Sequence, residues 1–324
     1  MTSAKIGIVG GAGYTAGELI RILLNHPQVE IAWVHSQSQS GKPIASLHQD
    51  LLGDTDLVFT DALDWSQTDV LFLCSGHGAS KAFLEQEVVP DHVKIIDLSH
   101  DYRLADPAHD FVYGLPELYK NQIREARHIA NPGCFATCIQ LGVLPLAYGE
   151  LLQEDVHVNA ITGSTGAGQQ PTATSHFSWR NNNISVYKPF THQHLNEIMQ
   201  SVTGLQPDYA GKLRFLPVRG NFTRGIFASL YTRITASLEE VTQRYQQFYQ
   251  DAPFVHITSE NPHLKQVVNT NKCLIHLQQH EDTVLIISMI DNLLKGASGQ
   301  AVQNMNLMMG WEETTALRLK SSSF

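Results

Sequence analysis

The sequence predicts an α/β fold made of two domains. Short apolar strands alternate with helical stretches as far as Asn131, which is the pattern of a parallel sheet covered by helices on both faces. Longer strands follow, and the length of 324 residues suits roughly two domains. We therefore expect a Rossmann-type domain at 1–133 and an α+β domain with a mixed or antiparallel sheet at 134–294. A C-terminal helical segment, about 295–324, is expected to pack back on the first domain.

The first domain begins with a strand, a glycine-rich turn and a helix. Residues 5–9 form a short apolar run, and glycines fill the turn after it. Leucine and isoleucine recur at helical spacing over 18–25, and Pro27 ends that helix. Three more apolar runs predict strands at 29–35, 70–74 and 93–98.

The second domain differs from the first in the composition and length of its apolar runs. Its apolar runs are rich in Ile, Val, Thr, Tyr and Phe, as half-buried antiparallel strands are. They lie at 156–162, 213–218, 225–234, 272–277 and 283–290. Ser237 and Glu240 form a capping-box pattern that predicts a helix to about Gln250. A last helical stretch is expected at about 299–309.

Composition excludes several classes of protein. The chain has 22 Lys and Arg against 31 Asp and Glu, and it has no basic block, so a nucleic-acid partner is not expected. No apolar run approaches the length of about 18 residues that a membrane span needs. The start of the chain is a poor signal peptide, and 4 cysteines are too sparse for a disulfide framework. These features predict a cytoplasmic protein.

The glycine turn predicts a dinucleotide site. Glycines at the end of a strand allow a close backbone approach, and the N-terminus of the following helix favours an anionic pyrophosphate. The spacing departs from strict G-x-G-x-x-G, so a purely structural glycine turn is the alternative. The residues expected at the cofactor are Gly10, Gly13, Tyr14, Thr15 and Ala16.

The loop after the second strand indicates which dinucleotide binds. An NAD site usually places Asp or Glu there for the ribose hydroxyls, and this loop has neither. It offers Ser36, Ser38 and Lys42 instead, which suit a 2′-phosphate. The sequence therefore favours NADP(H) over NAD; the alternative is a polar loop without a role.

Cys134 is the candidate nucleophile. It follows a Pro-Gly turn and precedes a stretch with helical spacing, so it is expected at a helix N-terminus, where the backbone dipoles favour a thiolate. Spacing alone leaves an inert buried cysteine equally open. For Cys74, Cys138 and Cys273, which lie within apolar runs, the inert alternative is preferred.

The densest histidine cluster supplies the candidate acid or base. It contains His192, His194 and Glu197. These residues suit either a catalytic histidine with a carboxylate that orients it or a metal group. Since no third ligand is indicated, no metal is expected, although a surface cluster without a role remains an alternative.

Eight blocks extend the pattern over almost the whole chain: IGIVGGAGYTAGEL at 6–19, DLSHDYRL at 97–104, VYGLPEL at 112–118, NPGCFAT at 131–137, GSTGAG at 163–168, HQHLNEI at 192–198, TRGI at 223–226 and DNLLKGASGQAVQNMNLMMG at 291–310. With these blocks in this order, the chain closely resembles the N-acetyl-γ-glutamyl-phosphate reductases. The resemblance implies an oxidoreductase of arginine biosynthesis, in which N-acetyl-glutamyl 5-phosphate and NADPH give the 5-semialdehyde and phosphate through a thioacyl group on Cys134.

The resemblance also implies roles for individual residues. His194 would be the residue that moves the proton, and His192 is the second candidate. Glu197 would either orient the catalytic histidine or cap the local structure. Arg103 and Asn131 would contact the transferred phosphate, and Arg224 would contact the substrate α-carboxylate, with a surface ion pair as the alternative for each arginine. The further residues expected at the cofactor or substrate are Ser164, Gly166, Asn292, Lys295 and Gly296.

Other functions remain possible at this stage. An aspartate-semialdehyde dehydrogenase would share the fold, cofactor and thioacyl chemistry, and a catalytically silent NADP-binding regulator would share only the first domain. A thiol hydrolase would not need the glycine turn. The group that blocks the substrate amine could be a carrier-protein adduct instead of acetyl. The resemblance further implies a homo-oligomer, either a dimer or a tetramer.

Overall fold

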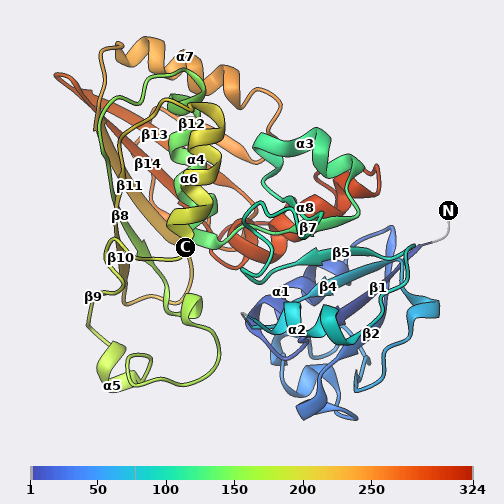
Figure 1. Cartoon of the computed structure of the whole chain (residues 1–324). Coiled ribbons are helices and arrows are strands. Elements are labelled where there is room, and N and C mark those ends of the chain that lie inside the picture. Colours follow the sequence, from blue (N-terminus) through green and yellow to red (C-terminus); the bar gives the residue numbers. More distant parts are fainter. Residues whose placement is uncertain (1–2, 77, 323–324) are drawn as a thin grey trace. The chain divides into compact units, whose positions relative to one another are not determined.

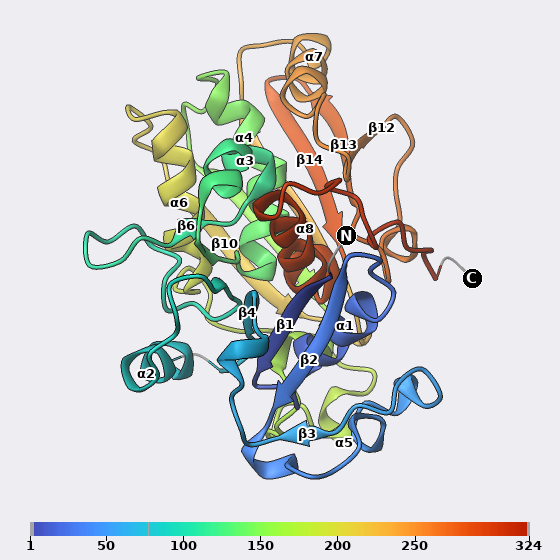
Figure 2. The same ribbon diagram turned by 90° about the vertical axis from the view of Figure 1, so that its right-hand side faces the viewer.

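The chain folds into two compact units, each with its own sheet and core (Figures 1 and 2). The computed structural model describes residues 3–76 and 78–322. The first unit comprises the chain up to Gly133 together with 297–318, and the second comprises 134–296 together with the residues from Leu319 onward.

The first unit is built on a parallel sheet. Its strands follow the order β3-β2-β1-β4-β5-β7-β6, and every neighbouring pair is parallel. The strands are β1 (Ala4–Val9), β2 (Val29–His35), β3 (Phe59–Thr60), β4 (Val70–Leu73), β5 (Lys94–Asp97), β6 (Val112–Tyr113) and β7 (His128–Ala130). The Rossmann-type prediction is confirmed. The strand order reverses between β1 and β4, the point where such sheets bind ligands at their carboxyl ends.

Helices cover both faces of this sheet. They are α1 (Tyr14–Leu23), α2 (Ala79–Gln86), α3 (Pro116–Glu125) and α8 (Gly299–Met308). From α2, Phe83 and Leu84 pack against Leu71 and Leu73 on one face. Helix α8 contacts α1, α3 and β5 and is buried along its whole length (Figure 2).

The last helix confirms the helical stretch expected at about 299–309, but the wider C-terminal segment expected at about 295–324 is helical only up to Met308. A π-helical turn occupies Leu294–Ser298, α8 follows and ends at Met308, and the described residues after it are not helical. Gly310 has φ +69, a left-handed conformation that ends helices. The backbone N–H of Ser322 then donates to the carbonyl of Val268 in the second unit.

The second unit is built on a mixed sheet, as predicted. Its strand order is β12-β13-β14-β11-β8-β10-β9. The pairs β12–β13 and β8–β10 are parallel, and the others are antiparallel. The strands are β8 (Val156–Thr162), β9 (Ser185–Val186), β10 (Leu213–Arg219), β11 (Ile226–Arg233), β12 (Val255–Thr258), β13 (Cys273–His280) and β14 (Thr283–Ile290).

One face of the mixed sheet is covered by helices α4 (Cys134–Tyr148), α6 (His194–Leu205) and α7 (Leu238–Phe248). Helix α4 lies beside α6 and against β11 and β14 (Figure 1). Burial alternates along β8 between buried and exposed residues, so the opposite face carries exposed side chains such as His157. The predicted capping box of Ser237 and Glu240 is present at the start of α7.

Candidate active site

The glycine turn of the first unit can accept a pyrophosphate. Gly10 has φ +78, and a Cβ at this position would lie 2.8 Å from the backbone of Cys74 and of Ser75, so only glycine fits. Gly13 is the N-cap of α1 and makes no side-chain cap hydrogen bond. Tyr14, Thr15 and Ala16 form the first helical turn. Because the N–H groups of such a turn favour anions, the residues fit a dinucleotide.

The loop after β2 has the polar character that was predicted. Ser36 is buried, and its backbone N–H donates to the carbonyl of Thr60 at 2.9 Å. Ser38 and Lys42 are exposed, and Lys42 Nζ donates to Gln39 Oε1 at 3.1 Å. The loop from Ser36 to Lys42 therefore offers three serine hydroxyls and one ammonium group, and the first carboxylate after His35 is Asp50.

Arg103 and Asn131 lie together in the first unit. Arg103 Nε donates to the carbonyl of Asn131 at 2.8 Å, and its Nη2 donates to the carbonyl of Leu98 at 2.9 Å. Asn131 Nδ2 donates to the carbonyl of Ala297 at 3.1 Å, and its Oδ1 accepts from Asn304 at 3.1 Å. These bonds fix the turn that leads to Cys134. A direct contact of either side chain with phosphate stays a prediction.

Cys134 is the first residue of α4 and is partly exposed, whereas the other three cysteines are buried. Burial raises the pKa of Cys74 to about 12 and holds the pKa of Cys138 well above its usual range. Gly296 packs directly on the nucleophile candidate, since a Cβ at Gly296 would lie 2.8 Å from the Cβ of Cys134. Among the four thiols, Cys134 has the position expected of a nucleophile.

The two histidines of the cluster lie beside Phe135, the residue after Cys134. The rings of His192 and His194 are 5.5 and 6.3 Å from that of Phe135, and 4.5 Å from each other. His194 Nε2 lies 3.9 Å from Glu197 Oε1. His192 Nδ1 accepts the backbone N–H of His194 at 3.3 Å. All three side chains are buried, so this is no surface cluster.

The protonation of His192 follows from its surroundings. Burial, and then the charge of Lys188, lower the pKa of His192 to about 4. The ring is therefore neutral near pH 7, and because Nδ1 accepts a hydrogen bond, the proton is on Nε2.

Tyr187 and Arg219 adjoin this cluster and were missed by the sequence reasoning. The Arg219 guanidinium lies 4.7 Å from the centre of the Tyr187 ring, which is 5.8 Å from the ring of His192. Burial, and then the charge of Cys134, raise the pKa of Tyr187 to about 12. Tyr187 is therefore within electrostatic reach of both the Cys134 thiol and the Arg219 guanidinium.

Arg219 is placed to bind an anion. Its Nε is buried without a hydrogen-bond partner among the residues that the structure describes. Arg180 donates to the carbonyl of Arg219 at 2.9 Å, and burial together with the charge of Arg219 lowers the pKa of Arg180. Two neighbouring cations favour a negatively charged ligand. In the sequence, nothing about Val218 and Arg219 indicated an arginine that binds an anion.

Arg224, the arginine chosen from the sequence, is engaged with a carboxylate. Its Nε and Nη2 each donate to an oxygen of Asp291 at 3.1 Å. Asp291 is buried and also accepts the backbone N–H groups of Asn269 and Leu293. The ion-pair alternative thus describes the observed contact, although this pair is partly buried and bidentate.

The structure brings Ser164 and Gly166 close to Asn292. The three lie around Thr165, whose hydroxyl accepts from Asn292 Nδ2 at 3.0 Å. Asn292 Oδ1 accepts the backbone N–H of Gly225 at 2.7 Å. Lys295 is fully buried in the π-helical turn, an element that often occurs at functional sites.

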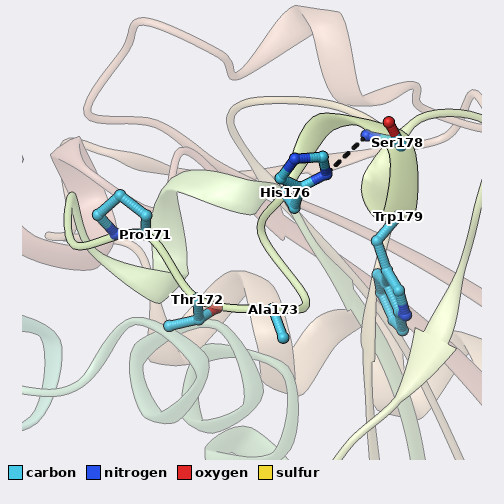
Figure 3. Close-up of a pocket in the computed structure, with 6 residues that line it drawn as sticks. All are labelled: Pro171, Thr172, Ala173, His176, Ser178 and Trp179. Carbon is cyan, nitrogen blue, oxygen red and sulfur yellow. Dashed lines mark hydrogen bonds between the residues drawn. The ribbon is translucent and has the colours of Figure 1, made fainter.

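A surface hollow of about 590 Å³ lies elsewhere in the second unit (Figure 3). Its lining residues are Pro171, Thr172, Ala173, His176, Ser178 and Trp179. His176 Nδ1 accepts the backbone N–H of Ser178 at 3.3 Å, and Trp179 points away from that bond. The hollow includes none of the candidate site residues.

Two further properties concern the described part of the chain. Over residues 3–76 and 78–322, no group of three His, Cys, Asp or Glu side chains is arranged to hold a metal ion. Within the same residues, no helix is long and apolar enough to cross a membrane.

Known proteins match the chain over both units. The model of the family "Semialdehyde dehydrogenase, NAD binding domain" matches residues 5–126, and that of "Semialdehyde dehydrogenase, dimerisation domain" matches residues 134–292. N-acetyl-gamma-glutamyl-phosphate reductases from Parabacteroides distasonis and Flavobacterium johnsoniae are 63% and 56% identical to it, each over 99% of both chains. The chain belongs to the N-acetyl-gamma-glutamyl-phosphate reductase family.

Solved structures share the fold of this reductase family member. Aspartate semialdehyde dehydrogenase II of Vibrio cholerae has a TM-score of 0.72 at 16% identity, with 96% of this chain and 99% of that one covered. The enzyme from Candida albicans has a TM-score of 0.67 at 14% identity, with 95% and 99% covered. Membership of the reductase family, with its NAD-binding domain, makes the chain an oxidoreductase with a nicotinamide cofactor.

Proposed function

We propose that the chain reduces N-acetyl-glutamyl 5-phosphate to N-acetyl-glutamate 5-semialdehyde, with NADPH as reductant and release of phosphate, in arginine biosynthesis. The observation that carries the proposal is the partly exposed Cys134 thiol at a helix N-terminus, flanked by a buried histidine pair, in a chain of the reductase family. The residue roles below are part of the proposal.

Cys134 performs covalent catalysis. Its thiolate, favoured by the N-terminus of α4, attacks the acyl carbon and breaks the bond to the phosphate oxygen, which leaves a thioester on sulfur. The nicotinamide, when bound, supplies the hydride that reduces this carbonyl. The carbon–sulfur bond then breaks, and the aldehyde and the Cys134 thiolate are released. Sulfur suits both steps, being a good nucleophile and a good leaving group.

His194 is the residue that moves the proton. It protonates the oxygen that becomes negative during reduction and takes that proton back as the thiolate leaves. Glu197, 3.9 Å from His194 Nε2, stabilises the charged form of this ring. His192 has a pKa of about 4, so it is too weak a base for this role and positions His194 through the backbone N–H that it accepts.

The substrate carboxylate is assigned to Arg219. This guanidinium is close to Tyr187 and has a buried Nε without a partner among the described residues, whereas Arg224 is held by Asp291. Arg103 and Asn131 remain the candidates for the departing phosphate. Both also order the turn before Cys134.

The cofactor is proposed to be NADP(H). Gly10, Gly13 and the first turn of α1 would hold the pyrophosphate, and Ser36, Ser38 and Lys42 the 2′-phosphate. Ser164, Gly166, Asn292, Lys295 and Gly296 are assigned to the nicotinamide or substrate. A cytoplasmic location is proposed because all four cysteines are thiols.

A homo-oligomer, a dimer or a tetramer, is also proposed. The open face of the mixed sheet presents a pair of stacked rings, His157 and Tyr231, with centroids 4.9 Å apart. Tyr231 is 46% exposed, and a second copy of this face could cover both rings.

The test is the reverse reaction, followed as NADPH absorbance. Purified protein is given N-acetyl-glutamate 5-semialdehyde, phosphate and NADP⁺, with aspartate semialdehyde and NAD⁺ in parallel. Turnover is expected only with the acetylated substrate and NADP⁺, and Cys134→Ser should lose it by about 1000-fold or more. Cys138→Ser, four residues along α4, is the matched control and should remain active.

Each other outcome contradicts a different part of the proposal. Turnover of aspartate semialdehyde would assign the substrate of the sister enzyme. Turnover that survives in Cys134→Ser would exclude the thioacyl mechanism. Inactivity with both substrates, despite NADP⁺ binding, would contradict the proposed reaction.

A further inference from the structure

We infer that His48 is a positioning residue of the dinucleotide site. It holds the peptide between Gly11 and Ala12 in the orientation that offers the Ala12 N–H to the cofactor pyrophosphate. The inference rests on the proposed binding of a nicotinamide dinucleotide, and His48 is not itself assigned a contact with the cofactor.

The first observation is a buried hydrogen bond into the glycine turn. His48 Nε2 lies 2.8 Å from the carbonyl oxygen of Gly11, and the side chain is 7% exposed. Since a carbonyl only accepts, Nε2 carries the proton and donates it. The N–H of Gly11 donates to the carbonyl of His35 at 3.0 Å. Both polar backbone groups of Gly11 are therefore engaged.

The orientation of the next N–H follows from peptide geometry. In a planar trans peptide, the carbonyl and the N–H point in opposite directions. Because the Gly11 carbonyl points at the buried His48 ring, the Ala12 N–H points away from it. A flipped peptide would instead turn the carbonyl oxygen outward, where its partial negative charge would repel a phosphate. His48 thus selects the conformation that suits an anion.

The second observation is Gly17, a glycine within α1. A Cβ there would lie 2.6 Å from His48 Nδ1 and 2.9 Å from its Cε1. Glycine inside a helix is destabilising relative to alanine, and here it provides the space that the imidazole needs. The sequence showed Gly17 only as part of a glycine-rich turn. Its spatial partner His48 lies outside every motif that was singled out.

His48 also belongs to the segment that carries the candidate 2′-phosphate residues. Its backbone N–H donates to the carbonyl of Ile44 at 2.9 Å, and Phe59 donates to the carbonyl of Lys42 at 2.9 Å. The rings of His48 and Phe59 are 6.1 Å apart. A change at His48 could therefore weaken dinucleotide binding through the pyrophosphate or through the 2′-phosphate, and the experiment must separate the two.

The experiment measures dissociation constants by titration calorimetry on the full chain, with NADP⁺ and NAD⁺ as the probes. His48→Phe keeps the ring shape but cannot donate, and Gly17→Ala displaces the ring. Both variants should bind each dinucleotide about tenfold more weakly, by the same factor, because the pyrophosphate is common to the two. His48→Gln, which restores an N–H donor, should recover part of the loss.

His26→Phe is the matched control. His26 is another buried histidine of the first unit, and its Nε2 bonds to Asn306 Oδ1 at 2.9 Å, so its loss should lower Tm but leave both dissociation constants unchanged. Unaltered binding by His48→Phe, or a loss confined to NADP⁺, would overturn the inference. If His48→Phe does not fold, Gly17→Ala decides between the same outcomes. A wild-type chain that binds neither dinucleotide would instead contradict the proposed cofactor.

Discussion

Two arginines close together in the sequence, Arg219 and Arg224, illustrate how neighbours decide a residue's role. Arg224 is held by both oxygens of Asp291, and that carboxylate is completely buried. Arg219 stacks on Tyr187 and has an Nε without a partner among the described residues. A buried ion pair is costly to break, whereas a guanidinium with no carboxylate partner among the described residues and an unsatisfied Nε is available to an anionic ligand.

The two arginines are therefore expected to respond differently to glutamine. Arg219→Gln should raise the KM for the acyl phosphate about 100-fold, since a charge-assisted contact is lost, with Tm nearly unchanged. Arg224→Gln should lower the free energy of unfolding by about 3 kcal/mol, because it leaves a buried carboxylate with fewer partners. Steady-state kinetics and denaturant unfolding measure the two effects. The reverse pattern of effects would assign the substrate carboxylate to Arg224 instead of Arg219.

The pKa of His192 gives a stability prediction. It is lowered from 6.5 to about 4, so between these values the unfolded chain binds a proton that the folded chain does not. The stabilisation is present above about pH 6.5 and is lost as the pH falls towards 4, with an upper limit of about 3 kcal/mol. Denaturant unfolding of wild type and His192→Asn should show that the difference between them shrinks from pH 7 to pH 4.5.

The test compares wild type with His192→Asn because other histidines also lower the stability of the folded chain as the pH falls. Burial also lowers the pKa of His26, His35 and His256. The pH dependence of wild-type stability alone would therefore combine the contributions of these three histidines and His192. A difference between the two proteins that does not change with pH would show that His192 is not the titrating group.

At the scale of elements, the π-helical turn Leu294–Ser298 packs against Cys134, the proposed nucleophile. Gly296 lies where a Cβ would meet the Cβ and Cα of Cys134 at 2.8 and 3.2 Å. The main chain of Cys134 begins α4, which is packed into the second unit. A side chain at Gly296 must therefore move either the turn or the thiol.

Gly296→Ala is expected to lower kcat by between about 10-fold and 100-fold, because small displacements of a reacting group are costly. Gly204→Ala in α6 is the control, since a Cβ there meets nothing within 4 Å. It should raise the free energy of unfolding by up to about 1 kcal/mol and leave kcat unchanged. Equal kcat for the two variants would show that the turn does not position Cys134.

At the scale of the whole molecule, the chain passes between the two units at 133–134, 296–297 and 318–319. The first two of these passages adjoin the Cys134–Gly296 contact. The two units otherwise have separate sheets and cores. The open face of the second sheet is the surface on which assembly is proposed.

Replacing Tyr231 with glutamate tests that surface. In a dimer formed through this face, two like charges would meet at a covered surface, so Tyr231→Glu should give the monomer mass in light scattering after size exclusion. Tyr148→Glu is the control, because Tyr148 is 64% exposed and its ring meets that of Phe248 edge to face at the helical side of the sheet. A dimer that persists in Tyr231→Glu but not in Tyr148→Glu would place the interface elsewhere.

Local patterns predicted much of this molecule. The strand at 156–162, the capping box at Ser237 and the character of both sheets could be recognised because each depends on residues close together in the chain. The strands β3, β6, β7, β9 and β12 were missed because each has only 2 to 4 residues, too few to show a period. The last helical stretch, about 299–309, was also predicted correctly. The wider segment of 295–324 was too long, because the left-handed backbone of Gly310 ends α8.

The sequence by itself determined the glycine turn, the position of Cys134 at a helix start and the His-x-His-x-x-Glu cluster, since each is a local arrangement of residue types. Only the tertiary structure decided that Arg224 belongs to Asp291, that Tyr187 lies near both the Cys134 thiol and Arg219, and that Gly17 makes room for His48. The physical reason is that burial, charge pairing and steric fit act between residues distant in the chain, and spacing along the chain does not report them.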